Sequence, residues 1–282
     1  MTDHHIDLHT HSSYSDGTFT PREIVTLAKE RGLQTFALTD HDATAGWDEA
    51  RVAAEEAGIR FVPGVEFSAA LEGSSVHVLA YWPSQQDEAF AAELQRLHDE
   101  RFRRGELMVA KLQELGYPIT FERVREISKG DNIVRPHIAQ ALVEAGVVAT
   151  SKDAFTEEFI ADGGRADVPK HAIHPVEAVG LIRRAGGVCV LAHPGMWGRS
   201  GAVPDELIEE MATAGMAGLE VNHPDHDEVS RAKYEEMAAS LGLAVTGSSD
   251  CHGNRYDPVR LGCETTTSEM LAVLEARRGD GS

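Results

Sequence analysis

Short apolar runs that end in polar residues alternate with segments of helical periodicity, and this alternation constrains the fold more than any other feature. The segments between the runs predict helices such as 21–31, which has Thr20 as N-cap, proline at its first position and Gly32 just beyond its end. Alternating strands and helices favour a largely parallel α/β sheet, either open or closed into a barrel. The predicted strands are 6–8, 35–38, 61–65, 76–81, 188–192, 219–221 and 243–246.

The region from about residue 85 to residue 173 interrupts this alternation. It contains no convincing buried strand, whereas 87–115 has the composition of a long helix and is followed by shorter helical pieces. Its charge also differs, because residues 96–137 contain nine Lys and Arg against seven Asp and Glu, while residues 1–95 contain five against sixteen. We therefore predict a discontinuous barrel domain formed by 1–84 and 174–282, and a mostly helical insertion or cap domain at 85–173.

The overall charge limits the possible partners. The chain of 282 residues has a formal net charge of −20, so its surface should repel long polyanions and anionic membranes. We expect no long duplex nucleic acid and no membrane as partners. Three cysteines form neither a disulfide framework nor a paired zinc motif, and no apolar segment is long enough to span a membrane, which favours a cytoplasmic protein.

Metal-ligand residue types follow the first apolar run. His9 and His11 are two residues apart, so in an extended segment their side chains point to the same side and can chelate one ion. Asp16, in the following loop, can reach a neighbouring ion. A solvated histidine pair is the alternative interpretation of this motif taken alone.

Similar clusters recur along the chain where apolar runs end. Each has an ordinary structural alternative, such as a solvated carboxylate or a half-buried histidine, but nearly every predicted strand supplies a ligand type at its carboxyl end, where α/β folds place their sites. The recurrence therefore predicts a multinuclear metal site. The further candidates are His41, Glu66, His77, His193, Asp250 and His252.

These motifs, in this order, resemble the PHP (polymerase and histidinol phosphatase) domain, and the resemblance covers residues 4–84 and about 174–265. It implies a distorted seven-stranded (β/α) barrel with a trinuclear centre at the carboxyl ends of its strands. It also implies three ligand sets, with Glu66 as the bridging carboxylate: His9, His11, Glu66 and Asp250; Asp16, His41 and His252; Glu66, His77 and His193.

The ligand chemistry is consistent with phosphate ester hydrolysis. Imidazoles and carboxylates without thiolate favour Mn, with Fe or Zn as alternatives, and clustered cations can deprotonate a bridging water near neutral pH. The resulting hydroxide would attack a phosphoryl group whose oxygens bind the same cations. Asp40, next to His41, is predicted to orient a ligand imidazole rather than to bind metal itself.

A negatively charged protein also needs anion anchors beyond its metals. Arg135 is suited to bidentate phosphate recognition, and the following Pro136 favours an extended backbone that would project its side chain toward the barrel mouth. The alternative is a surface arginine paired with Asp131. Further predicted anchors are Ser12, His137, Lys170 and Asn222; His223, which also follows a predicted strand, is predicted to protonate the leaving group, and the histidines predicted to be solvated are His4, His5, His98, His171, His174 and His226.

The helical insertion, the Arg135-Pro136-His137 element and the Asn222-His223-Pro224 element resemble one subgroup of the family. Its members act on nucleotides, as 3′,5′-nucleoside bisphosphate phosphatases or as 5′-to-3′ exonucleases on short RNA. The predicted function is therefore removal of the 3′-phosphate of 3′,5′-nucleoside bisphosphates such as pAp, with trimming of short 5′-phosphorylated RNA as a second predicted activity. Histidinol-phosphate phosphatase and a non-catalytic metal-binding accessory domain are the alternatives, and no pattern in the sequence defines the oligomeric state.

Overall fold

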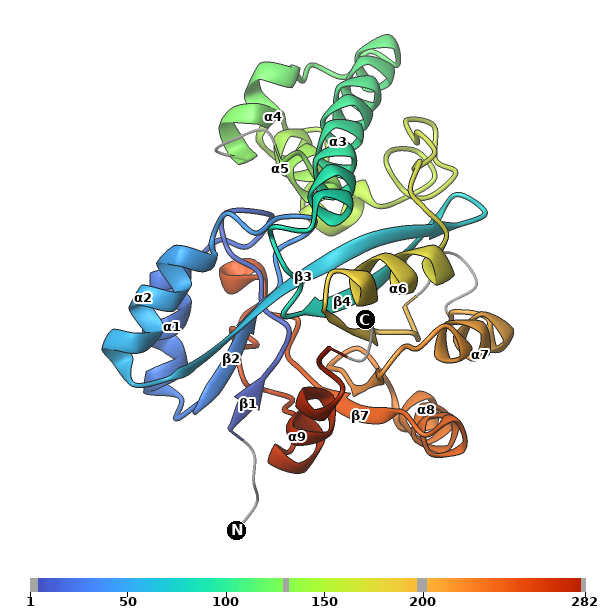
Figure 1. Cartoon of the computed structure of the whole chain (residues 1–282). Coiled ribbons are helices and arrows are strands. Elements are labelled where there is room, and N and C mark those ends of the chain that lie inside the picture. Colours follow the sequence, from blue (N-terminus) through green and yellow to red (C-terminus); the bar gives the residue numbers. More distant parts are fainter. Residues whose placement is uncertain (1–4, 129–131, 197–201, 280–282) are drawn as a thin grey trace.

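The computed structural model describes residues 5–128, 132–196 and 202–279, in which seven strands form a nearly closed barrel with helices around it (Figure 1). The α/β architecture and the seven strands expected from the sequence are confirmed. The strands are β1 (Ile6–Asp7), β2 (Thr35–Leu38), β3 (Arg60–Leu71), β4 (Ser74–Tyr81), β5 (Val188–Leu191), β6 (Gly218–Asn222) and β7 (Ala244–Gly247).

The strands pair in chain order, and only β4 reverses direction. β1, β2 and β3 are parallel, as are β5, β6 and β7, whereas β4 is antiparallel to both β3 and β5. The sheet is therefore largely parallel, as expected, and β4 is the exception within the described residues. The physical reason is a turn of two residues, Glu72 and Gly73, whose φ angles of 50° and 83° suit a tight hairpin that can only reverse the chain.

The barrel closes between its first and last strands without a regular ladder. Thr10 and Cys251 form an isolated parallel bridge just beyond the ends of β1 and β7, and the His11 N–H donates to the Cys251 carbonyl at 2.9 Å. The Ser249 N–H donates to the buried carboxylate of Asp7 at 3.1 Å. The segments that follow β1 and β7 therefore meet next to the residues that carry the candidate metal ligands.

Helices cover the outer face of the barrel, and the largest apolar cluster lies beneath them. Along β2, Phe36 and Leu38 belong to this cluster, while Ala37 belongs to a second cluster that includes Leu271 and Leu274. Because adjacent residues of a strand point to opposite faces, the second cluster fills the barrel interior. The helices around the barrel are α1 (Pro21–Glu30), α2 (Trp47–Ala57), α6 (Pro175–Arg184), α7 (Asp205–Thr213), α8 (Glu228–Leu241) and α9 (Ser268–Ala276), with a short η2 (Gly253–Arg255).

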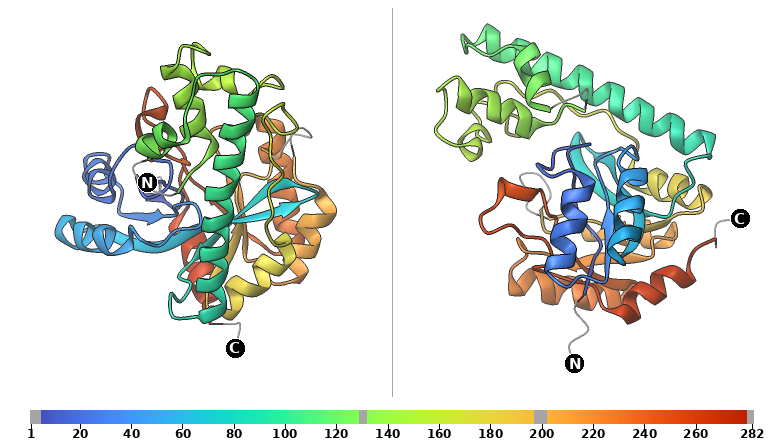
Figure 2. Two further views of the ribbon diagram at one scale, coloured as in Figure 1. Left: turned by 90° about the horizontal axis from the view of Figure 1, so that it is seen from above. Right: turned by 90° about the vertical axis from the view of Figure 1, so that its left-hand side faces the viewer.

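Helices occupy the region between β4 and α6, and the described part of 85–173 contains no strand. The first half of the long helix α3 packs on the barrel through Phe90 and Leu97, whereas its second half joins a separate apolar cluster that includes Leu112 and Leu142. Figure 2 shows this helix lying across one end of the barrel. The division into a barrel domain and an insertion domain stays a prediction. The elements are α3 (Glu88–Glu114), α4 (Phe121–Ser128), α5 (Arg135–Glu144) and η1 (Ser151–Ala154).

No helix in the described residues is both long enough and apolar enough to cross a membrane. The sequence also predicts a frayed tail at 277–282, which follows α9, a helix that the sequence pattern did not identify. Its last three residues lie outside the described residues, as does His4.

Candidate metal centre

The first group of candidate ligands lies at the mouth of the barrel, just beyond β1. The rings of His9 and His11 are fully buried, and their Nε2 atoms lie 3.1 Å apart. The Oε2 atom of Glu66 lies 3.1 Å from His11 Nε2 and 3.4 Å from His9 Nε2, and Asp250 Oδ1 lies 3.3 and 3.4 Å from the same two nitrogens. Two imidazole and two carboxylate ligand atoms therefore surround one small space.

Two further groups adjoin the first. Asp16 Oδ1 lies 3.2 Å from His252 Nε2 and 3.9 Å from His41 Nε2. Glu66 Oε1 lies 2.7 Å from His77 Nδ1 and 3.0 Å from His193 Nε2, while its Oε2 lies 2.9 Å from His41 Nδ1. Both oxygens of one carboxylate thus face different histidines, as a bridging ligand requires.

The β3–β4 hairpin explains how Glu66 and His77 come together. Ser68 pairs with His77, and Glu66 pairs with Leu79. Glu66 and His77 therefore lie on the same face of the hairpin, as diagonal neighbours on adjacent strands. Glu66 lies within β3, not at its end, because the strand continues to Leu71. The hairpin therefore supplies two ligands from the middle of its strands, whereas the other candidates follow strand ends.

His193 and Asp250 have positive φ angles of 27° and 47°. Such angles are uncommon for residues other than glycine and are held in place by surrounding structure, commonly at functional sites. The His193 N–H donates to Glu220 Oε2 at 2.7 Å, which holds the turn in this conformation.

Unpartnered buried atoms test whether these residues fit a metal centre. Asp16 Oδ1, His41 Nδ1 and Glu66 Oε2 are buried and make no hydrogen bond within the described structure. A buried polar atom left without a partner destabilises a protein by about 1–3 kcal/mol, so three in one place need an explanation. Divalent cations would satisfy all three, and a set of imidazole and carboxylate ligands without thiolate suits Mn, Fe or Zn.

The pKa values describe the same cluster without metal. Burial opposes charge on Glu66, yet the neighbouring His41 and His77 hold its pKa well below the ordinary value. Burial also opposes charge on His11, but Asp250 and Glu66 raise its pKa to about 10. His11 therefore retains a proton that a metal ion has to displace.

Glu220 is a positioning residue that the sequence reading missed. It is fully buried in β6, where Oε1 accepts from His9 Nδ1 at 3.0 Å and Oε2 accepts from the His193 backbone. Because the ring hydrogen of His9 is on Nδ1, its Nε2 carries a free lone pair, which faces the other candidate ligands. The one sequence signal that could have identified Glu220 is its position as a single carboxylate inside the apolar run 219–221. Asp7, similarly placed in the run 6–8, is also buried, and burial raises its pKa.

Asp40 and Ser12 lie beside the metal-ligand residues, and neither lines the cavity that is described in the next paragraph. Asp40 accepts from the Ser12 N–H at 2.7 Å, from the Ser12 hydroxyl at 2.6 Å and from the Ser15 hydroxyl at 2.5 Å. Ser15 Oγ in turn lies 3.4 Å from His11 Nδ1, so Asp40 reaches a candidate ligand through Ser15 and makes no hydrogen bond to His41. The Ser12 hydroxyl is used by Asp40 and does not line the cavity.

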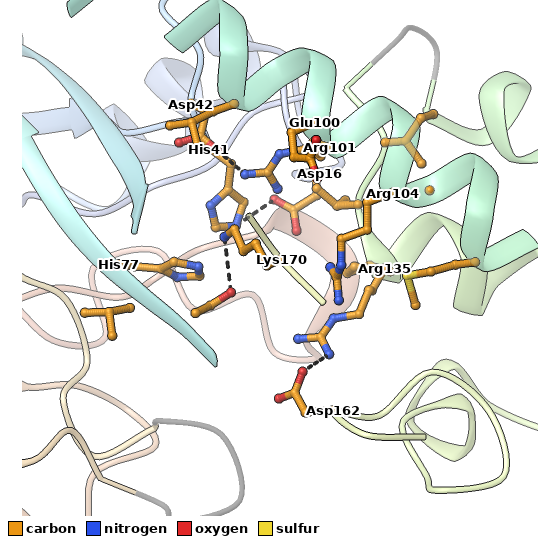
Figure 3. A pocket seen from close by; sticks show the side chains of 18 of the residues that line it. Asp16, His41, Asp42, His77, Glu100, Arg101, Arg104, Arg135, Asp162 and Lys170 are labelled. Atoms are coloured by element: carbon orange, nitrogen blue, oxygen red, sulfur yellow. Dashed lines mark hydrogen bonds and ion pairs between the residues drawn. The ribbon is translucent and has the colours of Figure 1, made fainter. Parts of the chain in front are cut away.

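A cavity of about 280 Å³ opens beside the metal-ligand residues, and its walls differ in chemistry (Figure 3). One part of its lining, which we call the metal wall, contains Asp16, His41, His77 and His193. Another part, which we call the cationic wall, carries four cationic side chains, contributed by α3, by α5 and by the segment before α6. These are Arg101, Arg104, Arg135 and Lys170.

Arg135 lies in this cavity, but its backbone differs from the expectation. It is the first residue of α5, with Val134 as N-cap, so the extended backbone predicted from Pro136 is wrong. The first turn of a helix does not need the N–H that proline lacks, and proline therefore begins a helix readily. Arg135 Nη1 donates to Asp162 at 2.6 Å and to the Ile160 carbonyl at 3.4 Å; Asp131, the alternative partner considered from the sequence, lies outside the described residues.

Lys170 also faces this cavity. Its Nζ donates to Ser75 Oγ at 3.1 Å. Burial and the positive charge of Arg101 lower its pKa to about 7. An arriving anion would restore the positive charge on this amine.

The remaining predicted anchors are distributed more widely. His137 is buried on α5 and does not line this cavity, and Asn222 ends β6 and does not line it either. His223 is fully buried, its Nε2 lies 3.5 Å from Asp250 Oδ2, and its Nδ1 accepts from the Asp225 N–H at 3.1 Å. Of the sequence's predicted anchors, Arg135 and Lys170 are therefore the two that reach the first cavity.

His226, predicted to be solvated, is buried instead. Its Nδ1–H donates to the Val221 carbonyl at 2.9 Å, and its Nε2 accepts from the Gly195 N–H at 3.1 Å. It satisfies two backbone groups and stabilises the turn after His193. His171 lines the cavity described above.

Comparison with known proteins gives a consistent result. The model of the PHP domain matches residues 7–145. A 3′,5′-nucleoside bisphosphate phosphatase of Chromobacterium violaceum is 34% identical, over 88% of this chain and 87% of its own length. A phosphoribosyl 1,2-cyclic phosphate 1,2-diphosphodiesterase of Eggerthella lenta is 32% identical over 88% and 94%, and a 5′-3′ exoribonuclease of Haemophilus influenzae is 31% identical over 87% and 89%.

Solved structures agree with these relatives. A predicted metal-dependent phosphoesterase of Bifidobacterium adolescentis superposes with a TM-score of 0.89 at 37% identity, covering 97% of this chain and 96% of its own. The similarity therefore extends over the barrel and over the helical region between β4 and α6.

Proposed function

The chain belongs to the PHP domain family of metal-dependent phosphoesterases, and from this premise we propose that it removes the 3′-phosphate of 3′,5′-nucleoside bisphosphates such as pAp. The family membership makes it a hydrolase of phosphoric esters. One observation supports the narrower substrate class: candidate metal ligands and four cationic side chains line the same cavity. A substrate with two phosphates can place one on each wall.

The cationic wall suits the phosphate that is not cut. Arg135 presents a planar guanidinium, and Arg104 lies close enough for their positive charges to interact. Each arginine is held by a carboxylate, Arg135 by Asp162 and Arg104 by Asp167. An incoming phosphate dianion would compete with Asp162 for Arg135, because the Asp162 side chain is 40% exposed while that of Arg135 is 25% exposed.

The candidate metal ligands of the metal wall would hold divalent cations. We propose three ions, with Mn as the expected metal. When bound, such ions polarise the phosphoryl group and supply a nucleophile derived from water near neutral pH. The described residues bring together four overlapping groups of candidate ligands, and the overlaps support ions that share ligands. Glu66 contributes to more than one of these groups.

His223 is the proposed proton donor to the leaving oxygen. Its Nδ1 accepts a backbone N–H, so Nε2, the ring nitrogen nearest Asp250, is the atom proposed to transfer the proton. That Nε2 atom is buried and makes no hydrogen bond within the described structure. His223→Ala should slow hydrolysis of a nucleoside 3′-phosphate by about 100-fold or more, yet affect an activated aryl phosphate little. Equal losses on the two substrates would remove His223 from this role.

Trimming of short 5′-phosphorylated RNA from its 5′ end is part of the same proposal. The named activity of the H. influenzae relative supports it, and the 5′-phosphate would occupy the position proposed for the second phosphate of pAp. The net charge of −20 disfavours long RNA.

The test is phosphate or nucleotide release from a substrate panel with added Mn²⁺. The panel contains pAp, 3′-AMP, 5′-AMP, histidinol phosphate, phosphoribosyl 1,2-cyclic phosphate and a short 5′-phosphorylated RNA. We expect the highest kcat/KM for pAp. Preference for histidinol phosphate or for the cyclic phosphate would overturn the proposed substrate class, and turnover of none would indicate a non-catalytic metal-binding domain.

A further inference from the structure

A second cavity, of about 450 Å³, lies on the other side of α5 from the first. Barrel loops, the end of α4, α5 itself and η1 all contribute to its lining. The residues that matter below are Ser13, Ser15, His137, Gln140, Ser151 and Arg255.

Helix α5 separates the two cavities. Arg135 and Ile138 line the first cavity, whereas His137 and Gln140 line the second. Each helical residue is rotated by about 100° from the last, so residues two apart point to nearly opposite sides. Arg135 and His137, adjacent anchors in the sequence reading, therefore serve different cavities.

The two cavities meet at a candidate metal ligand. Asp16 lines the first cavity, and its chain neighbours Ser15 and Gly17 line the second. Arg255 Nε donates to the Asp16 carbonyl at 2.7 Å, which fixes this guanidinium beside the same loop. A linear polymer bound across Asp16 could therefore occupy both cavities at once.

The second cavity is lined by hydrogen-bond donors. His137 is 5% exposed, and its Nδ1 accepts from the Val134 N–H at 3.3 Å, so the ring hydrogen is on Nε2. Burial lowers the pKa of His137 to about 4, which keeps the ring neutral. Arg255 adds one positive charge, and no acidic residue is among the described residues that line this cavity, although the chain as a whole is strongly acidic.

We propose that the second cavity binds the phosphodiester backbone of an oligoribonucleotide on the 3′ side of the bond that is cut. One arginine with neutral donors suits a phosphodiester, which carries a single negative charge, and the adjoining 2′-hydroxyl. The four cationic side chains of the first cavity suit the dianion of a terminal phosphate. This inference rests on the proposed function, and it explains how one centre would accept both pAp and short RNA.

The test changes the charge at Gln140, which lines the second cavity and makes one hydrogen bond, to Glu144 at 3.4 Å. Gln140→Lys and Gln140→Glu are compared with the unaltered metal-loaded protein. The readouts are kcat/KM for pAp and the dissociation constant of a 5′-phosphorylated trinucleotide whose phosphorothioate linkages resist cleavage. We expect the trinucleotide to bind about five-fold more tightly to the lysine variant and about five-fold more weakly to the glutamate variant, with pAp hydrolysis nearly unchanged.

Gln85 provides the matched control. It is exposed and follows β4, whose reversed direction places it at the end of the barrel away from the metal-ligand residues. Gln85→Lys and Gln85→Glu change the net charge equally and should leave trinucleotide binding unchanged. Equal effects at both positions, or no effect at Gln140, would overturn the inference. Absence of pAp turnover with charge-dependent trinucleotide binding would instead overturn the proposed function and leave the second cavity as an RNA site.

Discussion

The two walls of the first cavity are built in opposite ways. On the metal side, imidazoles and carboxylates are buried, and several of their atoms make no hydrogen bond in the described residues. On the phosphate side, each arginine is already paired with a carboxylate: Arg101 with Asp42, Arg104 with Asp167 and Arg135 with Asp162.

This difference separates two kinds of contribution. The metal-side residues share their contacts, and several of their atoms remain unsatisfied until a cation arrives, so the loss of one affects the whole centre. The phosphate-side arginines exchange one anion for another when substrate binds, so the loss of one changes affinity by degrees. Substitutions on the two walls should therefore differ in size and in the substrates they affect.

The largest effect should come from Glu66→Gln. Removing the shared carboxylate leaves neighbouring cations without the negative charge between them, so we expect kcat/KM to fall by about 1000-fold or more on every substrate, together with loss of bound metal. Steady-state kinetics and elemental analysis measure the two effects. Glu72→Gln, at the exposed tip of the same hairpin, is the control and should behave like the unaltered protein. Near-normal rates and metal content in Glu66→Gln would exclude a bridging role.

Arg135→Ala should have the next largest effect, and it should depend on the substrate. A desolvated arginine–phosphate pair contributes roughly 2–4 kcal/mol, so we expect a fall of about 30- to 1000-fold in kcat/KM for pAp and for 5′-phosphorylated RNA. 3′-AMP, with its single phosphate at the metals, should be almost unaffected. Arg123→Ala is the control, because Arg123 is an exposed, ion-paired arginine on α4. A similar fall for 3′-AMP would show that Arg135 contacts the phosphate that is cut.

Glu220→Gln should weaken metal binding by about 10- to 100-fold, the usual range for a residue that orients a ligand histidine. The amide retains one hydrogen-bonding oxygen but lacks the charge beside His9. Titration of metal-free protein with Mn²⁺ measures the effect, and the loss of rate should be recovered at high metal concentration. A loss of rate that excess metal does not restore would indicate a structural role only.

The smallest effect should come from Lys170. Its lowered pKa of about 7 means that the amine is charged below pH 7 and loses its charge as the pH rises through 7. The value of kcat/KM for pAp should therefore decline several-fold between about pH 6 and pH 8.5, more than it does for 3′-AMP. Lys170→Arg, which stays charged throughout, should remove this difference between the substrates. Identical pH profiles for the two substrates in the unaltered protein would contradict the assignment.

The structure brings together the candidate ligands that the sequence predicted, and there is a physical reason for this. Those residues follow or lie within extended strands, where spacing along the chain fixes direction, and their side chains have few other roles in such positions. Glu220 and Asp7 were missed because a single carboxylate inside a short apolar run does not disturb the strand pattern. Only the fold shows that both are buried beside the histidines.

Features that depend on contacts between distant segments were predicted less well. The predicted strands 61–65 and 76–81 left ten residues unassigned, and the reversal of β4 depends on a two-residue turn within that gap. The partner of Arg135, Asp162, lies 27 residues further along the chain, and no local pattern connects them. Histidine is a polar residue type, so His226 was predicted to be solvated. It is buried because its ring nitrogen accepts a hydrogen bond from the N–H of Gly195, in another turn.

The barrel closes between Thr10 and Cys251, which are synthesised at very different times. The candidate metal ligands therefore become available in a fixed order during translation. His41, Glu66 and His77, one of the candidate groups, emerge from the ribosome within the first third of the chain. The groups that include Asp250 or His252 combine them with His9, His11, Asp16 or His41, so they are completed only when the last eighth of the chain is made. A nascent chain therefore carries an incomplete chelating surface for most of its translation, and full metal loading becomes a late event that reports a finished barrel.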